Sequence, residues 1–462
     1  MIFQQYYLEC LSHASYLIGD EDSGRAVVID PQRDVTQYVG DAAAHGMTIE
    51  RVIETHVHAD FLSGHLELAE STGAVISYGE AAQGIEFAFE RLAHGQELTL
   101  GDVRLEVRAT PGHTPESISI VVFEHAGDTT PYAVLTGDTL FIGDVGRPDL
   151  LSSFGVTADE LARSLYHSLH EQLLTLPDAT RVFPAHGAGS ACGKQLSTER
   201  QSTIGEQKLV NYALQPMTED EFVAVVTEGQ PTAPGYFAFD AIRNREARPT
   251  LDEEQPPPAL DLETVLDVQR DGAVVLDTRD PMDFAAGHVR GAVNVSLAGR
   301  FAEWTGDVLT PDTRIVLFAN PASELEARIR LGRIGFDTVL GYLDDPLAVL
   351  ATHPEVTERS SRLTAGELEE RRRALGDELQ LLDVRNAGEI ALGAIPGSLP
   401  TPLPRLVDAV SNLDPSRPTV AYCGGGARSA VAASVLASRG FTDVSDVLGG
   451  FEAWRAETAD AA

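Results

Sequence analysis

Four short segments combine histidine, aspartate and glycine in a pattern that could hold a metal ion. They are 55–65 (T-H-V-H-A-D-F-L-S-G-H), 110–115 (T-P-G-H-T-P), 135–147 (L-T-G-D-T-L-F-I-G-D-V-G-R) and 182–187 (V-F-P-A-H-G). Each places a histidine or aspartate just after a predicted β-strand. Loops at one end of a sheet can bring such side chains together, and imidazole with carboxylate suits first-row transition metals. Scattered solvated histidines would explain one such segment more simply than four in series.

A second set of residues could carry covalent sulfur chemistry. Residues 420–428 read V-A-Y-C-G-G-G-A-R and lead into a helical stretch. A strand therefore delivers Cys423 into a glycine loop that ends at a helix N-terminus. Loop N–H groups can point at the sulfur and the helix end adds positive potential, so both favour a thiolate nucleophile. A phosphate-binding glycine loop with an incidental cysteine is the alternative.

The elements that must position these residues alternate between strand and helix over residues 1–240. Predicted strands cover 26–29, 51–55, 103–109, 117–123 and 131–136, and an amphipathic helix is predicted over 61–72. This alternation is typical of an α/β fold.

The remainder of the chain contains an internal repeat. The run A-V-V-L-D-T-R at 273–279 is echoed by Q-L-L-D-V-R at 380–385, and G-H-V-R-G-A at 287–292 by G-A-I-P-G-S at 393–398. Each repeat alternates strand and helix, which predicts a small parallel α/β domain. A charged, proline-rich stretch precedes the first repeat and predicts a semi-rigid linker. We therefore expect one domain over 1–243, a linker over 244–258, and repeats over 259–355 and 360–458.

Composition excludes several classes of function. The 462 residues carry 34 basic and 70 acidic side chains, so the net charge is −36. This balance argues against nucleic acid and anionic membrane surfaces as partners. No apolar run reaches the ~18 residues of a spanning helix, we identify no signal peptide, and three cysteines are too few for a disulfide scaffold. We expect a cytoplasmic enzyme. Lysine occurs only twice, which leaves open a high-salt host or a GC-rich genome.

Residues 1–240 resemble the metallo-β-lactamase superfamily, which implies an αββα sandwich with metal at one edge. The usual motif of the superfamily is H-x-H-x-D-H, and it commonly holds two metals. Here Phe61 stands in place of the last histidine, and His65 lies a turn further along. This departure disfavours a two-zinc thioester hydrolase of the glyoxalase II type, which is the alternative function.

The persulfide dioxygenases, a one-iron branch of that superfamily, are a better match. The resemblance implies that His56, His113 and Asp138 hold one Fe(II) per chain and leave open positions for substrate and O2. Three further residues would orient these ligands through hydrogen bonds, or be remnants of a second metal site. They are His58, Asp60 and His186.

Two other residues near this site have open roles. Arg147 lies in a G-R-x-D segment that also matches the branch. It could bind a substrate carboxylate or form a structural salt bridge. Cys192 lies six residues past His186, where it could receive or relay a sulfane sulfur or be a buried apolar-like thiol.

Residues 360–458 resemble a rhodanese domain, with Cys423 as the sulfur carrier and Arg428 closing a six-residue loop. The sulfur-binding residues between them are Gly424, Gly425, Gly426 and Ala427. Related phosphatases have a seven-residue loop that admits phosphate, so sulfurtransferase is favoured. Gly424 is neutral where rhodaneses often carry a cation, which leaves the donor open. The first repeat resembles the same fold with Phe318 at the position of Cys423, and we expect an inactive spacer or docking domain.

The whole chain therefore resembles a persulfide dioxygenase–sulfurtransferase fusion. The resemblance implies that a small thiol persulfide, of glutathione, coenzyme A or a similar thiol, is oxidised by O2 to sulfite. Cys423 would pass a sulfane sulfur to sulfite, giving thiosulfate, or take one from thiosulfate. The role would be persulfide detoxification, and we expect a homo-oligomer.

Overall fold

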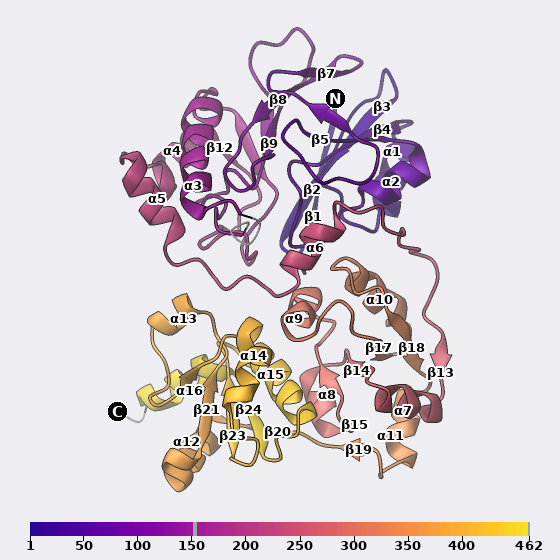
Figure 1. Ribbon diagram of the computed structural model, residues 1–462, viewed down its shortest axis with the longest axis vertical. Coiled ribbons are helices and arrows are strands. Elements are labelled where there is room, and N and C mark those ends of the chain that lie inside the picture. The colour runs from indigo at the N-terminus through magenta and orange to yellow at the C-terminus, as the bar shows by residue number, and fades with distance from the viewer. Residues whose placement is uncertain (151–154, 461–462) are drawn as a thin grey trace. The chain divides into compact units, whose positions relative to one another are not determined.

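The computed structural model describes residues 1–150 and 155–460, and these form two compact units (Figure 1). The first unit contains residues 1–233 and 237–253, and the second contains 234–236 and the chain from 254 onward. Among the described residues, no helix combines the length and the apolar character needed to cross a membrane.

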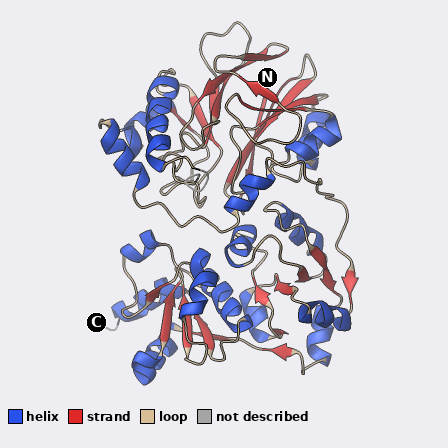
Figure 2. Cartoon of the chain, viewed as in Figure 1, coloured by secondary structure: helices blue, strands red, loops and turns tan. Residues whose placement is uncertain are grey.

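Within the described part of the first unit, two six-stranded sheets lie between helices (Figure 2). The first sheet has the order β1 (Ile2–Leu8), β2 (His13–Asp20), β3 (Arg25–Ile29), β4 (Thr48–Ile53), β5 (Val75–Gly79) and β6 (Glu90–Leu92). The second has the order β12 (Ser202–Thr203), β11 (Arg181–Pro184), β10 (Ala133–Gly137), β9 (Ile118–Phe123), β8 (Val103–Ala109) and β7 (Glu97–Leu100). The helices are α1 (Thr36–Ala44), α2 (His65–Thr72), α3 (Ala158–His167), α4 (Ile204–Val210), α5 (Glu219–Thr227) and α6 (Phe237–Arg243).

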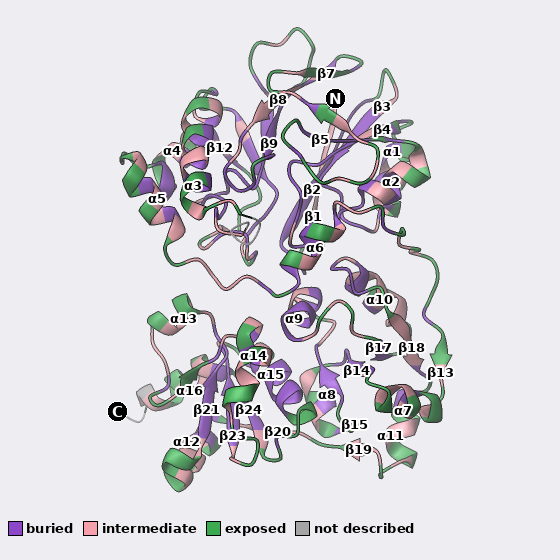
Figure 3. Ribbon diagram, viewed as in Figure 1, coloured by how far each residue is buried: buried purple, intermediate pink, exposed green. Residues whose placement is uncertain are grey.

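Alternating side chains along the strands build three apolar layers. Ile18 joins Leu105 of the opposite sheet in a core between the sheets. Its neighbour Leu17 points the other way and packs with Leu68 of α2, because successive side chains of a strand face opposite sides. Figure 3 shows strands β2 and β9, one from each sheet, as buried. The expected αββα sandwich is confirmed.

The helix predicted over 61–72 begins later than expected. α2 starts at His65, and residues 61–64 are not helical, with Ser63 in an isolated β-bridge to Gln32. The backbone N–H of Ser63 donates to Asn244 at 2.9 Å, and that of Gly64 donates to the Pro31 carbonyl at 2.9 Å. These tertiary contacts outweigh the helical pattern of the sequence, which could not reveal them.

In the described part of the second unit, two parallel five-stranded sheets share one topology. The first repeat has the order β13 (Ala259–Leu260), β18 (Val339–Leu343), β17 (Ile315–Phe318), β14 (Val274–Asp277) and β16 (Val293–Asn294). The second has the order β20 (Ser361–Leu363), β24 (Val444–Val447), β23 (Thr419–Tyr422), β21 (Gln380–Asp383) and β22 (Leu399–Pro400). The helices of the first repeat are α7 (Leu262–Arg270), α8 (Pro281–Ala286), α9 (Phe301–Val308), α10 (Glu324–Gly332) and α11 (Pro346–Thr352). Those of the second are α12 (Ala365–Leu375), α13 (Ala387–Ala391), α14 (Leu406–Ala409), α15 (Ala427–Ser438) and α16 (Gly450–Asp460). The two small parallel α/β domains are thus confirmed.

The D-x-R echo in the sequence marks the same buried ion pair in both repeats. Asp277 and Arg279 are 2.6 Å apart, as are Asp383 and Arg385. Each arginine also donates to the carbonyl eight residues on, at 2.8 Å. The pair therefore ties the end of a strand to the following turn in each copy.

We expect Asp383→Ala to destabilise the second repeat by about 3–5 kcal/mol, because it leaves the buried Arg385 guanidinium without its carboxylate. The measurement is denaturant unfolding in a Trp304→Phe background, where Trp454 of the second repeat is the remaining tryptophan. Asp408→Ala removes an exposed carboxylate on α14 and should change stability by less than about 0.5 kcal/mol. Equal midpoints for the two variants would contradict a structural role for the pair.

Candidate metal centre and sulfur-binding loop

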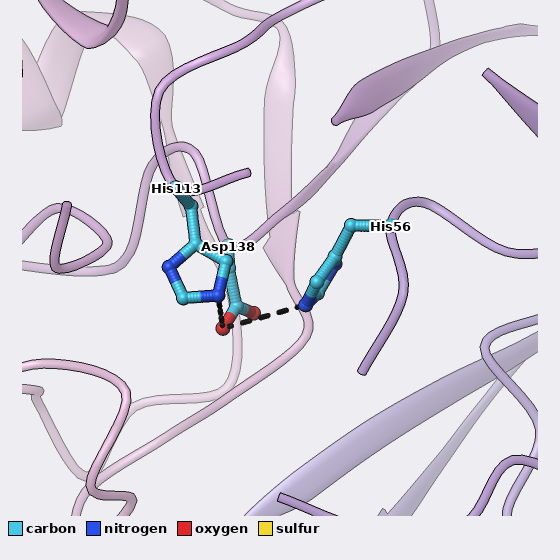
Figure 4. Close-up of side chains that lie close together, drawn as sticks. All are labelled: His56, His113 and Asp138. Atoms are coloured by element: carbon cyan, nitrogen blue, oxygen red, sulfur yellow. Dashed lines mark ion pairs between the residues drawn. The ribbon is translucent and has the colours of Figure 1, made fainter. Parts of the chain in front are cut away.

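The structure brings His56, His113 and Asp138 together at one edge of the sandwich (Figure 4). They follow β4, β8 and β10, so three strand ends converge on one point. The Nε2 atoms of His56 and His113 lie 3.9 and 3.5 Å from Asp138 Oδ2. All three side chains are buried.

The donor atoms of this cluster fit a metal ion. His56 Nε2 and both carboxylate oxygens of Asp138 have no hydrogen-bond partner among the described residues. Buried polar atoms without partners are costly, and a coordinated cation removes that cost. Two imidazoles and one carboxylate also form the facial ligand set of non-haem iron.

The other ring nitrogens are held by hydrogen bonds that leave Nε2 free. His56 Nδ1 lies 3.0 Å from Thr55 Oγ1, which donates to Asp30 at 2.8 Å. His113 Nδ1 lies 2.9 Å from the Arg147 carbonyl. Burial and the neighbouring His58 keep the pKa of His56 well below its ordinary value, so this imidazole is neutral and can act as a ligand.

His58 belongs to a different cluster. Its Nε2 lies 3.1 Å from Asp30 and 3.2 Å from Glu54. Burial by itself lowers the pKa of His58, but the charges of Asp30 and Glu54 outweigh burial and raise it well above the ordinary value. The ligand atoms of His58, Asp30 and Glu54 lie within 4.8 Å of one another and form a separate group that could hold a cation.

Phe61 occupies the motif position of the missing histidine, and His65 does not take over as a ligand. The ring of Phe61 packs against His13 and His58, with centroids 4.0 and 4.4 Å apart. His65 Nδ1 lies 3.5 Å from Glu54, and its ring packs at a tilt against Phe87 with centroids 4.8 Å apart.

Asp60, His186 and Cys192 form a second group whose ligand atoms also lie within 4.8 Å of one another. His186 Nε2 is 3.2 Å from Asp60 and 3.6 Å from Asp138, so this group adjoins the first. Burial, joined by the charges of Asp60 and Asp138, raises the pKa of the Cys192 thiol well above its usual value. The geometry accommodates either hydrogen-bonded support of the ligands or a remnant metal site.

Arg147 has the structural salt bridge that the sequence left open. Its buried guanidinium pairs with Asp149 through bonds of 2.8 and 2.7 Å and donates to the Ala191 carbonyl at 3.0 Å. Its backbone also contacts both His113 and Cys192, since the Arg147 N–H donates to the Cys192 carbonyl at 3.1 Å. The residue thus connects the two groups of metal-ligating side chains.

Cys423 lies at the end of β23, directly before the loop that starts α15. The backbone N–H of Gly426 donates to its Sγ at 3.1 Å, and Ser429 Oγ lies 3.6 Å away. Gly426 has φ +99°, and a Cβ there would meet backbone atoms of 447 and 449 at 3.2 and 3.1 Å. Arg428 makes two hydrogen bonds of 2.7 Å to Glu389 on α13.

In the first repeat Ala319 lies at the place of Cys423, because Phe318 pairs with Asp277 as Tyr422 pairs with Asp383. The sequence spacing, which predicts Phe318 at that place, is wrong by one residue. Phe318 ends β17, and the Arg279 guanidinium covers its ring at 4.2 Å. Its helix α10 starts with Glu324 and Glu326 in the first turn, which disfavours an anion there.

Sequence reasoning missed Asn244, which holds the loop that follows His56 (residues 57–64, here called the ligand loop) through hydrogen bonds. Its Nδ2 donates to the carbonyls of His58 and Phe61 at 2.9 and 2.7 Å, and its Oδ1 accepts from Ser63. Residues 244–253 of the segment expected to be a linker belong to the first unit. Nearby, Arg248 Nη1 donates to Glu67 of α2 at 2.7 Å. The charged composition of this segment gave no signal of burial.

These features define a metallo-β-lactamase domain followed by two rhodanese-like domains. The family profile described as "Metallo-beta-lactamase superfamily" matches residues 8–186, and "Rhodanese-like domain" matches 261–344 and 364–457. A bovine (Bos taurus) protein, "Persulfide dioxygenase ETHE1, mitochondrial", is 32% identical over 216 residues, which cover 46% of this chain and 75% of that protein. The chain belongs to the persulfide dioxygenase family.

Two further proteins are similar to this chain. The solved structure of a metallo-beta-lactamase from Staphylococcus aureus is 33% identical with a TM-score of 0.67, and covers 74% of this chain and 98% of that one. A cytoplasmic hydroxyacylglutathione hydrolase of Arabidopsis thaliana is 33% identical over 183 residues, or 39% of this chain and 66% of that protein.

We expect Asn244→Ala to weaken metal binding about 10–100-fold, because the ligand loop loses three hydrogen bonds. Stability should fall by about 1–3 kcal/mol, since three backbone groups lose their partner. Metal retained after anaerobic dialysis against a graded chelator measures the first effect. The control Asn320→Ala, at an exposed position of the first repeat, should leave metal retention unchanged; a loss as large as that of Asn244→Ala would contradict the clamp.

Proposed function

We propose that this chain oxidises small thiol persulfides with O2 at an iron held by His56, His113 and Asp138, and moves sulfane sulfur through Cys423. The overall oxidation is RSSH + O2 + H2O → RSH + SO3²⁻ + 2H⁺. Ferrous iron at this site would supply the redox chemistry of O2, which zinc lacks. The observation that carries the proposal is the convergence of buried ligand atoms without hydrogen-bond partners on one point.

Residues of the chain have defined tasks in this scheme. The hydrogen bonds of Thr55 and of the Arg147 carbonyl hold the two imidazoles with Nε2 turned toward Asp138. Phe61 places an apolar ring at the sixth motif position, where the superfamily carries its last histidine. Both features favour one metal over the bridged pair of a thioester hydrolase.

Cys423 carries the second half of the reaction. Its persulfide would pass sulfur to sulfite: Cys423–S–S⁻ + SO3²⁻ → Cys423–S⁻ + S2O3²⁻. The Gly426 N–H that contacts Sγ would stabilise the Cys423 thiolate that this step forms. Fusion of the two activities raises the effective concentration of sulfite at the loop.

Cys192 lies in the group with Asp60 and His186 beside the proposed metal, and its raised thiol pKa favours a buried neutral thiol over a sulfur-accepting thiolate. The thiol that carries the substrate persulfide is glutathione, coenzyme A or a similar small thiol.

His113→Ala should lose iron and lower O2 uptake by more than about a hundredfold, because the ion loses one of three protein ligands. Sulfur transfer through Cys423 should persist. Metal analysis of anaerobically purified protein and an oxygen electrode, with glutathione and coenzyme A persulfides, measure the outcome. His167→Ala, at an exposed histidine of α3, is the control. Two zinc ions per chain together with thioester hydrolysis would instead support the hydrolase.

Cys423→Ser should abolish sulfur transfer and leave O2 uptake intact, because the serine hydroxyl cannot carry sulfane sulfur. Thiosulfate formation from persulfide and sulfite is the measurement. Adding Ala319→Cys to this variant, at the position that corresponds to Cys423, should not restore transfer, since residues 320–323 contain no glycine. Loss of O2 uptake in Cys423→Ser would contradict two separate sites.

A further inference from the structure

An arginine and an aspartate on two neighbouring strands of the second repeat form an ion pair next to the Cys423 loop. Arg362 of β20 lies opposite Asp446 of β24 in the parallel register, and Figure 1 shows the two strands side by side. Arg362 Nε donates to one carboxylate oxygen at 2.9 Å, and its Nη2 donates to the other at 2.8 Å. The two side chains are 11% and 3% exposed, so the pair is held rigidly and solvent screens it little.

The same guanidinium reaches the backbone of the sulfur-binding loop. Arg362 Nη2 also donates to the Gly426 carbonyl at 3.4 Å. Gly426 is the loop residue whose N–H donates to Cys423 Sγ at 3.1 Å. Its φ is +99°, and a glycine has unusually wide backbone freedom. The direction of this N–H therefore depends on contacts from outside the loop.

Two further carbonyls of the loop are also held from outside. The Phe451 N–H donates to the Cys423 carbonyl at 2.7 Å, and the Glu452 N–H donates to the Gly424 carbonyl at 3.2 Å. Both donors belong to the first turn of α16. Carbonyls that are tied outward leave the N–H groups of a loop free to face an anion on the inside, and Arg362 extends this arrangement to Gly426.

The first repeat, which has no cysteine in its loop, also lacks this ion pair. Ala259 lies where Arg362 does, two residues before the N-cap of the following helix. It pairs with Tyr342 across the strands, as Arg362 pairs with Asp446. By contrast, both repeats keep the aspartate–arginine pair that follows the fourth strand in sheet order. A pair needed for the shared fold is expected in both copies, so one that accompanies the cysteine points to the chemistry of that cysteine.

We propose that Arg362, anchored by Asp446, is a positioning residue of the Cys423 site, where it fixes Gly426 so that its N–H faces Sγ and stabilises the thiolate. The inference rests on the proposed sulfur transfer through Cys423. Loading from a persulfide is Cys423–S⁻ + RSSH → Cys423–S–SH + RS⁻, in which the S–S bond of the donor breaks and the thiol leaves with its electron pair. The thiolate is the attacking species, so a hydrogen bond to Sγ raises the fraction of sulfur that can react.

The test measures how the reactivity of Cys423 depends on pH in the full chain. Alkylation by iodoacetamide is followed at the Cys423 peptide by mass spectrometry from about pH 5 to about pH 10. Arg362→Gln should move the midpoint of this profile up by about one pH unit, because the thiolate loses a charge-assisted hydrogen bond. Loading from glutathione persulfide below that midpoint should slow about threefold, since loss of thiolate outweighs the gain in nucleophilicity. Arg405→Gln removes the same charge at an exposed arginine of the same repeat and should change neither quantity.

A second variant, Asp446→Ala, separates positioning from charge. Loss of a nearby carboxylate would by itself favour the thiolate and lower the alkylation midpoint. Loss of the anchor for Arg362 should instead raise it. A lowered or unchanged midpoint in Asp446→Ala overturns the positioning role, and so does an unchanged midpoint in Arg362→Gln.

A double variant keeps the test decisive if either single variant fails to fold. Arg362→Ala with Asp446→Ala leaves no buried unpaired charge and should show the same upward shift; an unchanged midpoint there overturns the inference. Wild-type protein that is alkylated at Cys423 but takes no sulfur from glutathione persulfide overturns the proposed sulfur transfer, while the alkylation midpoints still decide the role of Arg362.

Discussion

Burial of ligand atoms without hydrogen-bond partners is the constraint on which the first unit depends. A carboxylate such as Asp138 is costly in a dry interior unless a cation offsets its charge. The contacts around the triad leave its ligand atoms free to bind such a cation. Each imidazole of the triad has its Nδ1 engaged by an oxygen, so its Nε2 is left for a metal. Next to them, His58 Nε2 lies 3.1 and 3.2 Å from the buried carboxylates of Asp30 and Glu54, and these three side chains form a separate group of possible metal ligands.

The sequence predicts the part of this site that follows from local pattern. A histidine or aspartate directly after a strand lies at the strand's end in any sheet, so His56, His113 and Asp138 could be placed at one edge. The contacts that brace them could not, because they join distant parts of the chain. Asn244 is almost two hundred residues from the loop it clamps, and it lies in a segment whose charges and prolines are typical of a linker. The start of α2 was missed for the same reason, since Asn244 and Pro31 take the N–H groups of its expected first turn.

Comparison of the two repeats distinguishes the residues that stabilise the fold from the cysteine that could carry sulfur. Both keep the buried aspartate–arginine pair and the same strand order. They differ directly after the third strand in sheet order, where Cys423 in one corresponds to Ala319 in the other. Both keep the aromatic ring that ends this strand, Phe318 and Tyr422, beneath the paired arginine. Loss of the cysteine therefore leaves the fold intact. The sequence reveals the loss because the repeat supplies an internal alignment, although that alignment misplaces the counterpart of Cys423 by one residue.

The net negative charge of the chain affects how the proposed oxidation and sulfur transfer would work together. Sulfite and thiosulfate are small dianions, and the chain carries a net charge of −36. The summed field of the protein therefore lowers their local concentration, most strongly at low ionic strength. In the proposed scheme, covalent fusion opposes this effect, because a tether raises the effective concentration of sulfite at the loop. A loop whose arginine is already paired with Glu389 adds little attraction for thiosulfate, so the proposed transfer favours release of this dianionic product.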